Sequence, residues 1–140
     1  MQTMEPVEFV HPVNVRYLEV DLQGVVFNMW YLAYVDDAMT GFLAAHGLRY
    51  RDLIAAGWDV MVVHTELDWR DGLRWGDEVG VAVRLVQLGR TSFRLGFEFR
   101  RDAEAVATAE MVYVCIATDG TGKRPIPDLL RAGLGAAAVG

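Results

Sequence analysis

Residues 16–31 read RYLEVDLQGVVFNMWY, and the expected fold is built outward from this stretch. The run from His11 to Val20 alternates apolar and polar side chains, which predicts a β-strand. Asp21 follows this run, and Gln23-Gly24 then marks a turn. We therefore expect the carboxylate of Asp21 at the end of a strand, close to the start of the next element.

A long apolar helix is predicted directly after this turn. Asn28 is a residue type that favours the N-cap position, and Gly47 suits the position just past a helix end. Between them, Met29 to His46 is apolar at nearly every position, and the polar residues 36, 37 and 40 share one narrow face with small residues. A helix that is apolar nearly all round is buried. A curved sheet wrapped around it would provide that burial in a domain of 140 residues.

The rest of the chain predicts one short helix, Tyr50–Ala56, and then antiparallel strands. Four strands are expected, separated by turns rich in Gly and Asp: Val60–Trp69, Glu78–Leu88, Thr91–Arg101 and Ala105–Thr118. The Gly- and Ala-rich tail at residues 132–140 is expected to fray. This order of elements predicts one α+β domain spanning residues 1–140, with helices on one face of an antiparallel sheet.

Composition narrows the functional classes. A net charge of -6 disfavours nonspecific nucleic-acid binding, because nucleic acids are polyanions. No apolar run approaches the roughly 18 residues of a membrane-spanning helix. The acidic N-terminus lacks the positive charge of a signal peptide, and a single cysteine excludes an internal disulfide. A cytoplasmic location is therefore expected, with no membrane partner.

Three common chemistries have little support in the residues. The only serine, Ser92, lies in a strand context without the G-x-S-x-G turn of a hydrolase, so we expect a structural hydroxyl, with a ligand contact as the alternative. Cys115 lies in an apolar strand without a nearby positive group to lower its pKa. His11, His46 and His64 are widely spaced, and no metal site is predicted.

Asp21 has two interpretations. An Asp ahead of a Gly favours an Asx turn, in which the carboxylate accepts a backbone hydrogen bond. An Asp beside a helix N-terminus can also do chemistry: the carboxylate attacks or activates water, while helix amides stabilise a developing negative charge. Asn28 likewise serves either as a simple N-cap or as the donor of such an amide.

The pattern of residues 17–31 resembles that of the 4-hydroxybenzoyl-CoA thioesterase family, which has the hotdog fold. The chain carries Tyr17-x-x-x-Asp21-x-x-Gly24-x-Val26-x-Asn28-x-x-Tyr31. Later landmarks of the family follow in order: Asp68-Trp69-x-x-x-Leu73-Arg74-x-Gly76-Asp77, Leu88-Gly89-Arg90-Thr91-Ser92-Phe93 and Arg124-Pro125-Ile126-Pro127. Together these landmarks span Val13 to Pro127. One departure is Gly72, where the family often has Pro.

The resemblance implies a hotdog fold, a homodimer joined sheet edge to sheet edge, and a homotetramer made of two dimers. The active site would lie at the dimer interface. Asp21 would be the catalytic carboxylate, as nucleophile or general base, and the backbone N–H of Asn28 would polarise the thioester carbonyl. Gly24 would permit the turn between them. A thiolate leaves readily, since its conjugate acid has a pKa of about 8.5, so no strong general acid is needed.

The implied substrate is an acyl-CoA, with coenzyme A as part of the substrate rather than a cofactor. Arg90 and Arg124 would contact its phosphates, with Ser92 a weaker candidate; solvated surface charges are the alternative for both arginines. The acyl group would lie near Tyr31 and His64.

Two other functions stay open: a thioesterase acting on acyl carrier protein, and a non-catalytic module that binds an acyl thioester. A hydratase ranks last, because no Asp/His pair with suitable spacing precedes the helix. Arg100 and Arg101 are expected to be a solvated strand end.

Overall fold

The computed structural model describes residues 8–136 of the chain. In chain order its elements are β1 (Phe9–Asn14), the 3-10 helix η1 (Tyr17–Glu19), α1 (Trp30–Ala45), α2 (Tyr50–Ala55), β2 (Trp58–Trp69), β3 (Glu78–Leu88), β4 (Ser92–Arg101), β5 (Glu104–Ala117) and α3 (Asp128–Gly133). None of the helices in this described range is long and apolar enough to cross a membrane.

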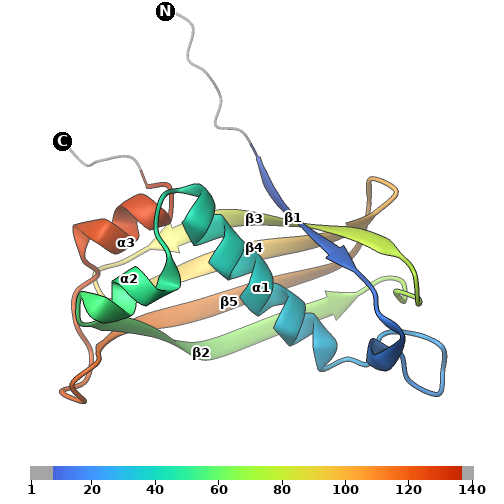
Figure 1. Ribbon diagram of the computed structural model, residues 1–140, viewed down its shortest axis with the longest axis horizontal. Helices are drawn as coiled ribbons and strands as arrows, with labels where there is room; N and C mark the ends of the chain where they lie inside the picture. The colour runs from blue at the N-terminus through green and yellow to red at the C-terminus, as the bar shows by residue number, and fades with distance from the viewer. Residues whose placement is uncertain (1–7, 137–140) are drawn as a thin grey trace, which may run out of the picture.

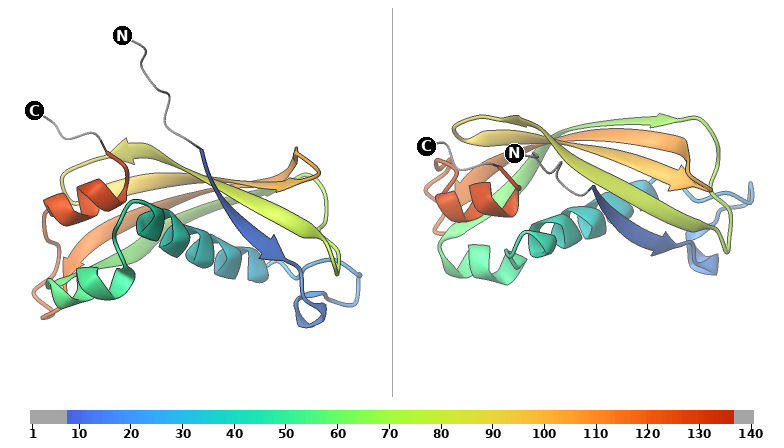
Figure 2. Two further views of the ribbon diagram at one scale, coloured as in Figure 1. Left: turned by 45° about the horizontal axis from the view of Figure 1, so that its top comes forward. Right: turned by 90° about the horizontal axis from the view of Figure 1, so that it is seen from above.

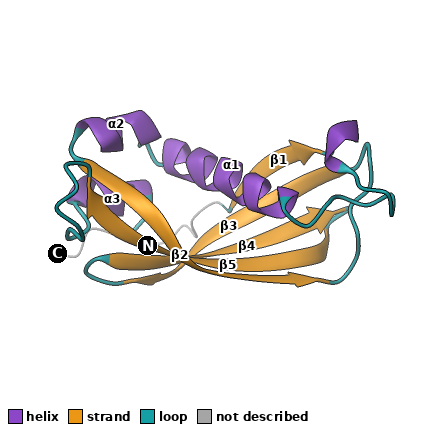
Figure 3. Cartoon of the chain, turned by 90° about the horizontal axis from the view of Figure 1, so that it is seen from below, coloured by secondary structure: helices purple, strands orange, loops and turns teal. Residues whose placement is uncertain are grey.

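The strands form a single antiparallel sheet in the order β1-β3-β4-β5-β2, which leaves β1 and β2 at its edges (Figure 1). The sheet is strongly twisted, and α1 crosses the face that it curves around (Figure 2). The short helices α2 and α3 lie on this same face, at the end of α1 far from η1 (Figure 3). The fold is α+β, as the order of elements predicted.

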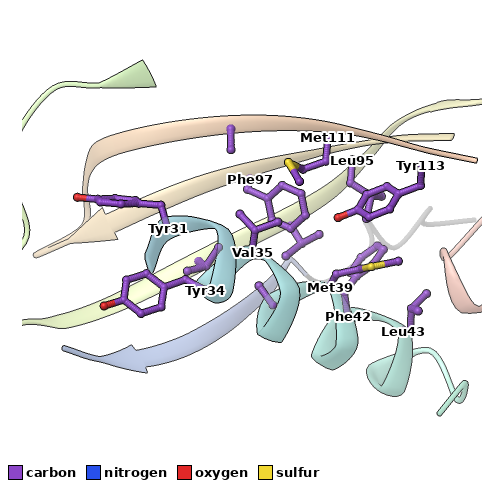
Figure 4. Packing of buried hydrophobic residues seen from close by; sticks show 14 of the residues in the cluster. Tyr31, Tyr34, Val35, Met39, Phe42, Leu43, Leu95, Phe97, Met111 and Tyr113 are labelled. Carbon is purple, nitrogen blue, oxygen red and sulfur yellow. The ribbon is translucent and has the colours of Figure 1, made fainter. Parts of the chain in front are cut away.

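The core lies between α1 and the inner face of the sheet (Figure 4). On β4 the buried aromatic and Leu side chains alternate with polar ones, so that one face of the strand is dry. The inner face of α1 fills the space above them with Val35, Ala38, Met39 and Phe42. Burying each large apolar side chain contributes about 1.5–3 kcal/mol, which explains how a sheet covered on one face holds the helix in place.

Helices α1 and α2 and the last four strands begin and end within two residues of their predicted bounds. The prediction for the first strand was wrong, because β1 ends at Asn14 instead of Val20. Pairing with β3 stops at Asn14, and Val15 instead forms hydrogen bonds with the turn that precedes β3. The Val15 N–H donates to Asp77 O at 3.0 Å, and the Val15 carbonyl accepts from Gly76 N at 3.1 Å. The chain then closes into η1.

The C-terminal prediction needs a second correction. Helix α3 covers residues 128–133 and was not predicted, so it includes the first two residues of the stretch that was expected to fray. Gly133 packs so closely on Leu48 that a Cβ there would lie 2.6 Å from Leu48 Cδ2, and Leu134 is buried. Gly133 therefore has no room for a larger residue beside the loop that follows α1. Residues 137–140 lie outside the described range.

Candidate active site

Asp21 lies in a tight turn between η1 and α1. Its N–H donates to Val25 O at 2.9 Å, its carbonyl accepts from Gly24 N at 3.0 Å, and Val20 pairs with Val26 in an antiparallel bridge. Gly24 has a φ of +79°, a left-handed conformation that costs other residues about 1–2 kcal/mol. The predicted turn at Gly24 is therefore present, although it closes a small hairpin rather than following a long strand.

The Asp21 side chain forms an Asx turn and keeps one oxygen free. Oδ1 accepts a hydrogen bond from the Gln23 amide at 2.8 Å. Within the described residues, Oδ2 accepts no hydrogen bond from the protein, and the residue is partly exposed. The Asx-turn interpretation is therefore confirmed for Oδ1, and Oδ2 is left without a protein hydrogen-bond partner in the described range.

Asn28 is not the N-cap, contrary to the prediction. The N-cap is Met29, with no side-chain capping bond, and α1 begins at Trp30. The helix starts with tight i→i−3 bonds from the amides of residues 30, 31 and 32. Among the described residues, no protein group accepts from the Asn28 or Met29 amide. Both amides therefore lie without a protein acceptor at the positive end of the helix dipole.

Glu19 is a member of the site that the sequence did not single out. It is 3% exposed and the only buried charged residue in the described range. Its Oε1 accepts from Tyr34 Oη at 2.8 Å and from Arg16 N at 2.9 Å, and its Oε2 accepts from Arg16 Nε at 2.9 Å. Burial opposes ionisation, but these hydrogen bonds outweigh it and hold the pKa of Glu19 below its ordinary value. The one local signal was Arg16, three residues earlier.

A second support for the site is the loop between β2 and β3. The Val26 amide donates to Leu73 O at 2.8 Å, which ties this loop to the turn. Arg101 Nη1 donates to Gly72 O at 2.9 Å and to Asp77 Oδ2 at 3.0 Å, and its Nη2 pairs with Asp71. Arg101 is therefore an ion-paired clamp, and the expectation of a solvated strand end was wrong.

Arg100 differs from its prediction in the same way. Its guanidinium pairs with Glu8 and, through Nε at 2.7 Å, with Glu98. These ion pairs lie on the outer side of the sheet, away from α1, and the pair with Glu8 ties the residue before β1 to β4.

The two residues predicted to line the acyl site do not come together within one chain. Tyr31 is 1% exposed and packs in the core, with ring centroids 5.3 Å from Phe99 and 5.9 Å from Trp69. His64 is exposed on edge strand β2, where Nε2 lies 2.8 Å from Glu66 Oε1. A bulge between Val62 and His64 pairs His64 with Val112, on the sheet face opposite α1. Sequence spacing could not reveal this change of face.

The three predicted phosphate contacts gather at the other end of the sheet. Ser92 begins β4, and the Arg90 carbonyl accepts from Ile126 N at 2.8 Å. The Arg124 guanidinium stacks 3.7 Å from the Trp58 ring centroid and donates to Gly57 O at 3.0 Å. Strand β4, ten residues long, separates this end from the Asp21 end by about 30 Å. Asp21 and these three residues therefore lie at opposite ends of the sheet in one chain.

A groove opens between α1, α2 and edge strand β2, with a volume of about 360 Å³. Its lining combines apolar side chains, hydroxyl-bearing side chains and one carboxylate: Met39, Leu43, Val60, Val62, Thr40, Tyr50, Tyr113 and Asp36. Burial, and then the charge of Asp37, raise the pKa of Asp36. The Tyr113 hydroxyl is buried and has no hydrogen-bond partner among the described residues. A larger hollow of about 630 Å³ involves none of residues 19–28, so it is not part of this site.

Cys115 and the metal-ligating residue types bear on two other chemistries, a thiol nucleophile and a metal centre. Burial raises the pKa of the Cys115 thiol, and this effect is larger than the lowering caused by the nearby charge of Arg124. The sequence did not indicate that a positive group lies close to Cys115. Within residues 8–136 no group of three His, Cys, Asp or Glu side chains is placed to hold a metal ion.

Comparisons with known proteins agree with this architecture. Residues 15–134 match the family model described as the thioesterase-like superfamily. A 1,4-dihydroxy-2-naphthoyl-CoA hydrolase of Synechococcus elongatus is 26% identical over 119 residues, covering 84% of this chain and 88% of that protein. The fold superposes on a hypothetical protein of Thermus thermophilus with a TM-score of 0.80 and 32% identity, over 88% of this chain and 95% of that one. It superposes on the dynemicin thioesterase, described as binding a polyene, with a TM-score of 0.82 and 26% identity, over 92% and 96%.

Proposed function

Because the chain belongs to the thioesterase-like superfamily, we propose that it hydrolyses an acyl-CoA thioester at Asp21 and the Asn28 amide. One observation carries this proposal: a single turn holds a carboxylate with a free oxygen beside a helix start with free amides. The narrower resemblance to the 4-hydroxybenzoyl-CoA thioesterase family is part of the proposal.

The proposed chemistry needs only those two groups. The Asn28 amide donates to the thioester carbonyl oxygen and stabilises the negative charge that develops there, which is worth about 2.7–4 kcal/mol for one such donor. Asp21 Oδ2 either attacks the carbonyl carbon, giving a mixed anhydride that water then cleaves, or takes a proton from an attacking water. Both routes expel coenzyme A as its thiolate and release the free acid. Single turnover in H₂¹⁸O separates them, because only the anhydride route lets ¹⁸O enter Asp21.

The active unit is proposed to be a homodimer joined along β2. This edge strand exposes apolar side chains that a monomer would leave in water, among them Met61, Val62 and Val63. A two-fold axis at the middle of β2 reverses the partner's sheet. The partner's Arg90 and the partner's Arg124 then lie at the Asp21 end, so one coenzyme A can reach both. The homotetramer stays a prediction.

The acyl group is proposed to follow α1 into the groove. Asp36 comes eight residues after Asn28, about 12 Å along the helix axis, a span that suits a flat aromatic or conjugated acyl group. Relatives named for dihydroxynaphthoyl-CoA and for polyene binding support this substrate class.

The test is coenzyme A release from a panel of acyl-CoAs (short, long and aromatic), with one acyl carrier protein thioester. We expect Asp21→Asn to lower kcat by about 10²–10⁴-fold while the fold stays intact. Glu98→Gln is the control, because Glu98 is a carboxylate on the outer face of the sheet that accepts from Arg100 Nε at 2.7 Å and belongs to neither end of the proposed site. Near-normal turnover by Asp21→Asn would reject the assignment. Turnover of the carrier-protein thioester alone would change the substrate class.

A further inference from the structure

Glu19 and Tyr34 form a buried hydrogen bond, the Glu19–Tyr34 link, between two segments of the candidate site. The bond from Tyr34 Oη to Glu19 Oε1, 2.8 Å long, joins residues that are 15 positions apart in sequence. One end is η1, and the other lies one turn inside α1. Removing a carboxylate from water is costly, and a well-packed apolar residue in its place is often neutral or stabilising. Stability alone therefore gives little reason for a charge at this position.

The link connects the two groups proposed to act on the thioester. Asp21 follows Glu19 by two residues, so the backbone position of Glu19 determines where the Asp21 carboxylate lies. The Glu19 carbonyl also accepts from Phe27 N at 2.9 Å, and Phe27 is the residue directly before Asn28. Glu19 thus contacts the Asn28 side of the turn through its backbone and α1 through its side chain.

We propose that Glu19 and Tyr34 are positioning residues, which fix the Asn28 amide relative to the Asp21 carboxylate for attack on the thioester. This inference rests on the proposed function. Without the link, the turn stays attached to the β2–β3 loop by the Val26–Leu73 bond, but η1 is free to shift against the start of α1. Neither side chain touches the reacting atoms in this arrangement.

Two isosteric variants test the proposal. Tyr34→Phe removes only the hydroxyl donor, and Glu19→Gln keeps an oxygen acceptor but loses the charge that holds Arg16. A misplacement of 1 Å can cost about 10²-fold in rate, so we expect kcat to fall roughly 10- to 100-fold in each variant, with KM within about twofold. The kcat of the double variant should be no lower than that of the less active single variant, since the two substitutions break the same Glu19–Tyr34 hydrogen bond.

Glu110→Gln is the matched control. Its carboxylate also accepts from an arginine, Arg94 Nη1, at 2.9 Å, but on the outer face of the sheet. This variant should lose a comparable ion pair and keep its kcat. Unchanged kcat in Tyr34→Phe and Glu19→Gln, or equal losses in Glu110→Gln, would overturn the positioning role. If Glu19→Gln fails to fold, Tyr34→Phe decides.

A second readout does not depend on turnover. In ¹H–¹⁵N spectra, Glu19→Gln and Tyr34→Phe should both shift the amide signals of Phe27 and Asn28, and Glu110→Gln should leave them in place. Should the wild type hydrolyse no thioester, the proposed function fails, yet these shifts still test whether the link sets the position of the Asn28 amide. Unmoved Phe27 and Asn28 signals would overturn the inference.

Discussion

Gly72→Ala is the most informative substitution in the loop that supports the site. A Cβ at Gly72 would lie 2.6 Å from Val25 Cγ1 and 3.1 Å from Val25 Cβ. Carbon atoms in contact prefer about 3.5–4.0 Å, so the loop and the turn must separate by about 1 Å. This contact also explains the departure from the resembled family, because the same position could not hold the larger Pro without that movement.

The displacement has two measurable consequences. Overpacking of this kind costs about 1–3 kcal/mol, which corresponds to a fall in Tm of roughly 3–9 °C. The Val26–Leu73 bond passes the movement to the turn, two residues before Asn28. We therefore expect kcat to fall roughly 10- to 100-fold, measured as coenzyme A release at saturating acyl-CoA.

A double-mutant cycle separates the clash from a general effect of losing glycine. Val25→Ala removes Cγ1, so Gly72→Ala with Val25→Ala should recover most of the kcat that Gly72→Ala loses. Gly47→Ala is the control: Gly47 has a φ of +86° and nothing within 4 Å of its Cβ position, so it should lower Tm and leave kcat unchanged. Wild-type kcat in Gly72→Ala, or no recovery in the double variant, would refute the reasoning.

Three further predictions concern stability and assembly. Tyr113→Phe removes a buried hydroxyl without a partner, so the free energy of unfolding should rise by about 1 kcal/mol; a lower Tm on thermal melting would show that the hydroxyl is bonded in the assembled protein. The pKa of Glu19 is lower in the folded state than its ordinary value of 4.5. The ionised carboxylate therefore adds its full contribution to the free energy of unfolding above pH 4.5, and this contribution is lost as the pH falls through the pKa of the folded state. Urea unfolding should therefore show the advantage of wild type over Glu19→Gln shrinking below pH 4.5, and a constant difference would contradict this. Val63→Lys places two like charges next to the proposed two-fold axis, because Val63 lies at the middle of β2 and is exposed in the single chain. It should weaken dimerisation at least ~10-fold in sedimentation, whereas an unchanged dimer would exclude the β2 interface.

Local patterns in the sequence predicted most of the fold. Alternation along residues 92–101 identifies the buried face of β4, and the continuous apolar run after Asn28 identifies a helix that must be covered. Both signals are local, because the spacing of apolar side chains along a strand or helix indicates which of its faces is buried. The Asp21–Gly24 turn was predicted for the same reason: a Gly at positive φ and an Asx bond involve only neighbouring residues.

The positions of partners were not predictable from such patterns. Glu19 is a charged residue in a short apolar run, and its burial makes sense only with Tyr34, which arrives from inside α1. Arg101 was predicted to be solvated at a strand end, because the sequence does not show that the loop at residues 71–77 packs against it. A β-bulge moved His64 to the outer face, while Tyr31 turned into the core.

The sequence by itself therefore determined the class of fold, the long central helix, and the turn that carries Asp21 and Asn28. Tertiary structure decided where β1 ends, which charges are paired, that the free helix amides precede Trp30, and that a groove opens beside Asp36. The physical reason is that periodicity and turn chemistry act between near neighbours along the chain. Hydrogen bonds such as Glu19–Tyr34 and Val26–Leu73 exist only after the sheet has brought distant segments together.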